Sequence, residues 1–291
     1  MSQDEVKKLL NKVLDLESEL KLKNEEVMIY REELILFSKK LDNLMSSVSV
    51  DMKFLAEMQK VLAPTHLPTI PGFEISRKFV FGSKTGGDYF DFFEFEDKFR
   101  FGVMVASSSG YAMSAIFLSF VLKFSHALQA KKGTLPEEIL QKVGEELKVA
   151  ASEKDLTHAF YAVIDRRDYS LRFCSVGNIL GFYIAPNKPV LILKSTVSPF
   201  GQQFSEKLTA AQIELDPDSR LCLVTDGLSD VLGADRIVEI ITDNIKSTVH
   251  DLRNELLFQA QQKSGLTEPL RDQTVVVIEA AGRLIKLAKS T

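Results

Sequence analysis

The chain has 291 residues, of which 45% are apolar and 26% are charged, and its formal net charge is −4. This size suits one domain with a substantial core together with an accessory segment. The slightly acidic balance excludes the basic surface expected of a nucleic-acid-binding protein and disfavours an anionic membrane as the main partner. The sequence has no run of about 18 apolar residues for a membrane helix and no signal peptide. We therefore expect a cytoplasmic protein.

Residues 1–62 contain neither glycine nor proline and carry a heptad pattern. With Val6 at position a, eight successive a positions are apolar, and the d positions are apolar or aromatic apart from Lys23 and Asp51. This pattern predicts a parallel two-stranded coiled coil and therefore a homodimer. The alternative is a helix that folds back on its own domain, but a period of 3.5 residues argues against it. The predicted dimerisation residues are Val6, Leu9, Val13, Leu16, Leu20, Val27, Tyr30, Leu34, Phe37, Leu41, Leu44 and Val48.

A proline-rich junction at 63–72 separates this helix from a globular domain at 73–291. In the globular domain the apolar period changes to two, which is typical of strands. The order of predicted elements is strands, two helices, strands, two helices and a last strand, which indicates two sheets covered by helix pairs. The predicted strands are 73–81, 90–95, 99–105, 159–164, 171–176, 180–184, 190–193, 221–225 and 274–279, and the predicted helices are 112–131, 136–152, 234–247 and 249–264.

Three aspartates lie beside a glycine or at a predicted strand end. Asp88 follows two glycines, Asp226 opens the sequence Asp-Gly-Leu-Ser-Asp, and Asp272 stands in Arg-Asp-Gln-Thr. Carboxylates projecting from such rigid positions are suited to bind hard divalent cations, and two such ions can activate a water that attacks a phosphoryl group. Each aspartate taken alone is equally compatible with a structural role in a turn or at a helix N-terminus.

Taken together and in this order, these motifs resemble those of the PPM-type bacterial serine/threonine phosphatases of the SpoIIE/RsbU-like group. The resemblance implies an α+β fold, an α/β/β/α sandwich of two mostly antiparallel sheets flanked by helix pairs, preceded here by the coiled-coil helix. It implies Mn²⁺ or Mg²⁺ as cofactor, with Asp226 and Asp272 holding the first metal and Asp88 supporting the second. The same resemblance gives supporting positions to Gly87, Gly110 and Gly227.

The segment Val103–Gly110 departs from the family pattern. The family has Asp-Val-Ser-Gly here, and its aspartate bridges the two metals; aligned on Gly110, that position is Ser107. Two divalent ions about 4 Å apart repel each other by roughly 4–16 kcal/mol before their ligands are counted. A neutral hydroxyl does not offset this repulsion, so the bridging position lacks its carboxylate.

Two functions remain open at this point. The first is a signalling protein whose phosphatase-like domain is non-catalytic or severely weakened and binds a phosphoprotein or regulatory partner. The alternative is an active Mn²⁺- or Mg²⁺-dependent phosphoserine/phosphothreonine phosphatase in a partner-switching pathway. A third interpretation, the GGDEF motif of diguanylate cyclases, is set aside because Gly86-Gly87-Asp88-Tyr89-Phe90 has tyrosine in place of glutamate and leaves the later motifs unexplained.

Overall fold

The computed structural model describes residues 3–62, 67–83, 87–109, 134–151 and 153–281. The chain divides into two compact units, Met1–Phe54 and Leu55–Thr291. Helix α1 (Gln3–Leu62) confirms that the N-terminal segment is helical. The predicted helix at 112–131 lies outside the described residues, as does Gly110.

Within these described residues, ten strands form two five-stranded sheets in which every pairing is antiparallel. The strand order is β1-β10-β9-β6-β7 in the first sheet and β2-β3-β4-β5-β8 in the second. The bounds are β1 Phe73–Val80, β2 Tyr89–Glu94, β3 Arg100–Ser108, β4 Thr157–Asp165, β5 Ser170–Val176, β6 Leu180–Ile184, β7 Leu191–Leu193, β8 Ala211–Glu214, β9 Arg220–Val224 and β10 Gln273–Ala280.

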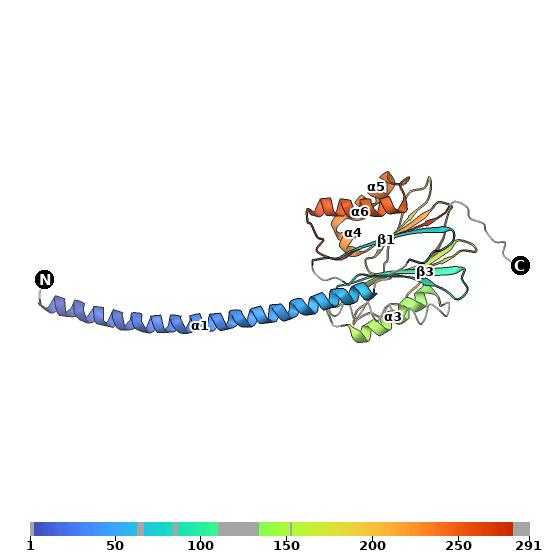
Figure 1. Ribbon diagram of the computed structural model, residues 1–291. Coiled ribbons are helices and arrows are strands. Elements are labelled where there is room, and N and C mark those ends of the chain that lie inside the picture. Colours follow the sequence, from blue (N-terminus) through green and yellow to red (C-terminus); the bar gives the residue numbers. More distant parts are fainter. Residues whose placement is uncertain (1–2, 63–66, 84–86, 110–133, 152, 282–291) are drawn as a thin grey trace. The chain divides into compact units, whose positions relative to one another are not determined.

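The two sheets pack face to face, and helices cover their outer faces (Figure 1). Helices α4 (Asp226–Leu232), α5 (Ala234–Asp243) and α6 (Val249–Ser264) cover the first sheet. Helix α3 (Pro136–Ala150) covers the second sheet. The predicted α/β/β/α sandwich is therefore confirmed.

The central strands are buried on both faces, which explains why they read as unbroken apolar runs. On β3, Val103 and Val105 face the other sheet, whereas Met104 and Ala106 face α3. Side chains alternate across a strand, so a strand covered on both sides needs apolar residues at every position. A large one, such as Val103 or Met104, contributes about 1.5–3 kcal/mol when it is fully buried.

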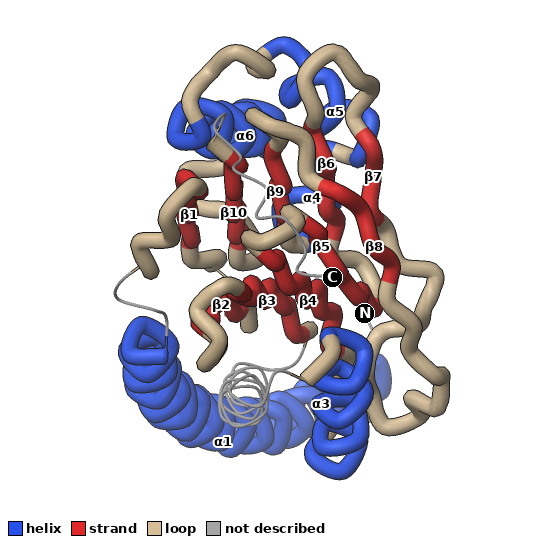
Figure 2. Tube along the Cα trace, turned by 90° about the vertical axis from the view of Figure 1, so that its right-hand side faces the viewer, coloured by secondary structure: helices blue, strands red, loops and turns tan. Residues whose placement is uncertain are grey.

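The register of the strands places the predicted site residues at one end of the sandwich, where several strands begin or end. The start of β2 pairs with the end of β3, with Tyr89 opposite Ala106. The end of β9 pairs with the start of β10, with Val224 opposite Val275. The two sheets lie against each other (Figure 2), and Asp88, directly before β2, accepts hydrogen bonds from Thr225 and Thr274 of the first sheet. The segments that carry Asp88, Asp226 and Asp272 therefore converge at one end of the sandwich.

Among the described helices, none has an apolar stretch long and uncharged enough to cross a lipid bilayer.

Candidate functional site

Asp88 lies directly before β2 and joins the two sheets through hydrogen bonds. Its Oδ2 accepts from the hydroxyl of Thr225 at 2.7 Å and from the hydroxyl of Thr274 at 2.8 Å. Both threonines are completely buried and belong to the ends of the first sheet, whereas Asp88 belongs to the second. This carboxyl group therefore fixes the spacing of the two sheets at the site.

The environment of Asp88 favours its protonated form. Burial raises the pKa of Asp88 well above its usual range, and the neighbouring carboxylates of Asp272 and Asp226 raise it further. Hydrogen bonds from Thr225 and Ser107 act in the opposite direction, but they do not outweigh the burial. The raised pKa of Asp88 thus reflects its burial first and the nearby carboxylates second.

Asp272 is buried directly before β10 and accepts hydrogen bonds from main-chain N–H groups. Its Oδ1 accepts from Gly82 N at 2.8 Å, and its Oδ2 accepts a long bond from Asp88 N at 3.5 Å. The main chain of Asp272 also explains Gly227, because a Cβ at Gly227 would lie 2.0 Å from the carbonyl oxygen of Asp272. Only glycine allows this close approach. Gly227 thus lets the first turn of α4 approach the main chain of Asp272.

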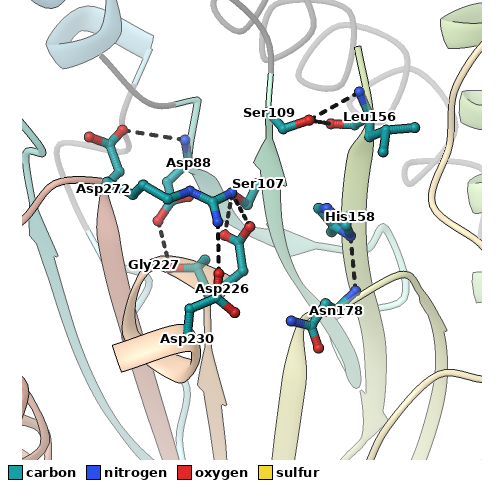
Figure 3. Close-up of polar contacts among 12 residues, drawn as sticks. Asp88, Ser107, Ser109, Leu156, His158, Asn178, Asp226, Gly227, Asp230 and Asp272 are labelled. Atoms are coloured by element: carbon teal, nitrogen blue, oxygen red, sulfur yellow. Dashed lines mark hydrogen bonds and ion pairs between the residues drawn. The ribbon is translucent and has the colours of Figure 1, made fainter. Parts of the chain in front are cut away.

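Asp226, the first residue of α4, has a donor on each carboxylate oxygen. The Ser107 hydroxyl donates to its Oδ1 at 2.7 Å, and the guanidinium of Arg271 forms an ion pair with its Oδ2. The other guanidinium nitrogen of Arg271 lies 2.9 Å from Asp230 Oδ2. The side chain of Asp226 is 3% exposed, whereas that of Arg271 is 40% exposed. Figure 3 shows Asp226 pointing toward Ser107, with Asp88 and Asp272 beside them.

The arrangement does not fit a pair of metal ions. In the described part of the chain, no group of three or more His, Cys, Asp or Glu side chains is arranged to hold a metal. Both oxygens of Asp226 already have donors, and the positive charge beside it is that of Arg271. A cation at Asp226 would therefore have to compete with the guanidinium of Arg271 for this carboxylate.

The structure brings Asp88, Ser107, Asp226 and Asp272 into one buried cluster. Gly87 is also buried there, and its carbonyl oxygen accepts from Ser108 N at 3.2 Å. Sequence reasoning thus located the cluster. The role of each aspartate as a metal ligand stays a prediction.

Two residues near the cluster had no role in the sequence analysis. Arg271 stands directly before Asp272, and a lone arginine beside an acidic motif is the signal that could have drawn attention to it. His158 on β4 accepts a hydrogen bond on Nδ1 from Asn178 N at 3.0 Å. Burial lowers the pKa of His158, and Asp226 partly opposes this, so its neutral form is favoured. The contact between His158 and Asn178 joins residues 20 positions apart, and no sequence pattern indicates it.

The family model for Stage II sporulation protein E (SpoIIE) matches residues 97–281. The chain belongs to the SpoIIE family of PP2C-type phosphatase domains. Phosphoserine phosphatase RsbP of Bacillus subtilis (strain 168) is 19% identical over 201 residues, which cover 68% of this chain and 50% of RsbP. The chain thus matches only half the length of that relative.

Solved structures show the same fold. The SiaA-PP2C domain of Pseudomonas aeruginosa superposes with a TM-score of 0.67 at 16% identity, covering 81% of this chain and 98% of that one. The PP2C phosphatase domain of SpoIIE from Bacillus subtilis, solved with a fragment of its regulatory domain, gives a TM-score of 0.60 at 16% identity, covering 71% and 63%. At these identities the likeness shows the fold. PP2C-family phosphatases use Mn²⁺ or Mg²⁺. In this chain, Ser107 at the bridging position and the ion pair between Arg271 and Asp226 oppose the binding of these ions.

Proposed function

We propose that this protein is a signalling protein of the SpoIIE family whose phosphatase-like domain is non-catalytic or severely weakened. In this proposal the domain acts by binding a phosphoprotein or another regulatory partner. The contacts of Asp226 support the proposal most directly, because Ser107 donates to one of its carboxylate oxygens and Arg271 forms an ion pair with the other.

The chemical reason lies in the charge that two divalent ions would need. Two such ions are held together by carboxylates placed between them, and a neutral serine at the bridging position supplies none. Arg271 adds a positive charge at the same place and increases the repulsion. Without a metal pair, a water molecule near Asp226 has no group that lowers its pKa enough to attack a phosphate ester at neutral pH.

The alternative is an active Mn²⁺- or Mg²⁺-dependent phosphoserine/phosphothreonine phosphatase in a partner-switching pathway. One observation favours it: Asp88, Asp226 and Asp272 remain together and buried at the edge of the sandwich. In that case Arg271, whose side chain is 40% exposed, would have to swing out when metal binds. The rate of Mn²⁺-dependent phosphate ester hydrolysis distinguishes the two functions.

We expect hydrolysis of p-nitrophenyl phosphate with millimolar Mn²⁺ to stay near the uncatalysed background. The reason is the missing bridge at Ser107 together with the ion pair between Arg271 and Asp226. The control is Asp226→Asn, which should give the same residual rate. Robust Mn²⁺-dependent turnover that Asp226→Asn abolishes would establish the active phosphatase instead.

We also propose that α1 forms a parallel homodimer through its a and d positions. Within Leu16–Leu41, the described a and d side chains are apolar or aromatic except Lys23, and each apolar one is 44–70% exposed in the single chain. An isolated helix gains little from its own hydrogen bonds in water, so such a stripe needs a partner. A second copy in register would cover it along the whole seam.

The dimer predicts twice the chain mass of 32.6 kDa in light scattering at micromolar concentration. The variant Val27→Gln/Leu34→Gln places amides in two a layers and keeps helix propensity. Because four buried aliphatic side chains are lost per dimer, we expect its dissociation constant to rise by at least about a hundredfold. A monomeric wild-type protein at this concentration would rule out the dimer.

A further inference from the structure

Helix α1 carries a second apolar stripe on the side opposite its a/d seam. At about 100° per residue, heptad positions b and c centre on the direction opposite to a and d. In two-stranded coils these positions face solvent and are normally polar. Here six of them are large apolar side chains that are 52–61% exposed: Leu14, Leu22, Met28, Ile29, Ile35 and Leu36.

The central part of this stripe alternates apolar and acidic residues. Leu22 is followed by Glu25, then by the pair Met28 and Ile29, then by Glu32, and then by the pair Ile35 and Leu36. Successive members are three or four residues apart, so they form one continuous line along the helix. We call residues 22, 25, 28, 29, 32, 35 and 36 the outer stripe.

Charge around the outer stripe selects the kind of molecule that can cover it. Between Leu14 and Phe37 the basic residues are Lys21, Lys23 and Arg31, and Lys23 is already paired with Glu26 at 2.7 Å. The acidic residues outnumber them: Asp15, Glu17, Glu19, Glu25, Glu26, Glu32 and Glu33. A second copy of α1 would bring acidic residues against acidic residues, and an anionic lipid surface would be repelled in the same way.

We propose that the outer stripe binds a basic amphipathic helix of a partner protein. The apolar side of that helix packs on the Met28/Ile29 and Ile35/Leu36 layers, and its lysines or arginines pair with Glu25 and Glu32. The apolar layers supply most of the affinity, and the charges fix the register and exclude acidic helices. The inference rests on the proposed dimer in one respect, since burial of the a/d seam is what leaves this stripe on the outside.

The test uses the full chain and a synthetic 21-residue peptide with paired leucines every seventh residue and lysines between the pairs. A second peptide carries glutamates in place of the lysines. We expect fluorescence anisotropy to show binding of the lysine peptide at least tenfold tighter than that of the glutamate peptide. Raising the salt concentration should narrow this difference, because exposed charges are screened.

The outer-stripe variant Ile29→Gln/Leu36→Gln should bind the lysine peptide at least tenfold more weakly than wild type, with an unchanged dimer mass. The seam variant Val27→Gln/Leu34→Gln is the matched control, because it lowers dimerisation and keeps the outer stripe. If the wild type is monomeric, the dimer is refuted, and the inference stands only when the outer-stripe variant loses the peptide and the seam variant keeps it; loss in both variants overturns it.

Three results would overturn the inference. The first is equal binding of both peptides, or binding that the outer-stripe variant leaves unchanged. The second is a wild-type tetramer that this variant reduces to a dimer, since a second copy would then cover the stripe. The third is loss of the dimer in the outer-stripe variant, which would make the stripe the dimer seam.

Discussion

Mn²⁺ should bind to the double variant Ser107→Asp/Arg271→Gln at least about a hundredfold more tightly than to the wild-type protein, a gain of roughly 2.7 kcal/mol. In the wild type, both oxygens of Asp226 have donors and the nearby positive charge is a guanidinium. The double variant removes that cation and returns a carboxylate to the position between the predicted metals. Titration calorimetry measures the affinity and the number of ions bound.

The single variant Ser107→Asp should gain much less. The Ser107 hydroxyl lies 2.7 Å from Asp226 Oδ1, so a carboxylate at position 107 would stand beside another carboxylate in a buried site. Arg271 would pair with both and compete with the metal. We therefore expect the single variant to be less stable than wild type without metal and to bind Mn²⁺ only weakly.

Two controls keep this result interpretable. The neutral variant Ser107→Asn/Arg271→Gln has a similar shape and should bind far more weakly than the aspartate double variant, because it removes Arg271 but supplies no carboxylate between the predicted metals. Thermal unfolding should show that Mn²⁺ raises the melting temperature of the aspartate double variant, because a ligand that binds only the folded state stabilises it. Negligible binding by both double variants would mean that the pocket has changed more widely, and tight binding by wild type would contradict the role assigned to Arg271.

Most strands could be predicted from the sequence, because burial on both faces requires an unbroken run of apolar residues. Nine predicted strands are present, and their ends agree with the structure within a few residues. The edge strand β8 (Ala211–Glu214) was missed, because its short sequence is mostly polar and it lies at the sheet edge. Helix α4 was also missed, since seven residues that begin with an acidic turn motif do not show a helical period.

The candidate site was predicted in its residues but not in its contacts. The resemblance to the phosphatase family grouped Asp88, Asp226 and Asp272, and in the structure they lie together in one buried cluster. The Ser107 substitution was visible in the sequence as a missing charge. Its hydrogen bond to Asp226, 119 residues away, was not visible, nor was the ion pair of Arg271 across 45 residues. Such contacts depend on loop geometry that local patterns do not encode.

Arg271→Gln should destabilise the protein by about 1–3 kcal/mol, which corresponds to a fall in melting temperature of roughly 3–10 °C for a domain of this size. The side chain of Asp226 is 3% exposed, so loss of its cation leaves a buried carboxylate next to other carboxyl groups. Breaking a buried pair commonly costs 3–5 kcal/mol, and we reduce the figure because Arg271 is 40% exposed. Chemical denaturation at pH 7 measures the change.

Arg236→Gln is the matched control for this prediction. Arg236 pairs with Glu239 at 2.8 Å on the exposed side of α5, so its removal should change the unfolding free energy by less than about 0.5 kcal/mol. Asp226→Asn added to Arg271→Gln should recover part of the loss, because it removes the charge that was left unpaired. The single variant Asp226→Asn should cost less than Arg271→Gln, since the guanidinium of Arg271 keeps its pair with Asp230 and water can reach it. If the double variant were no more stable than Arg271→Gln alone, the loss would come from packing of the arginine and not from the buried carboxylate.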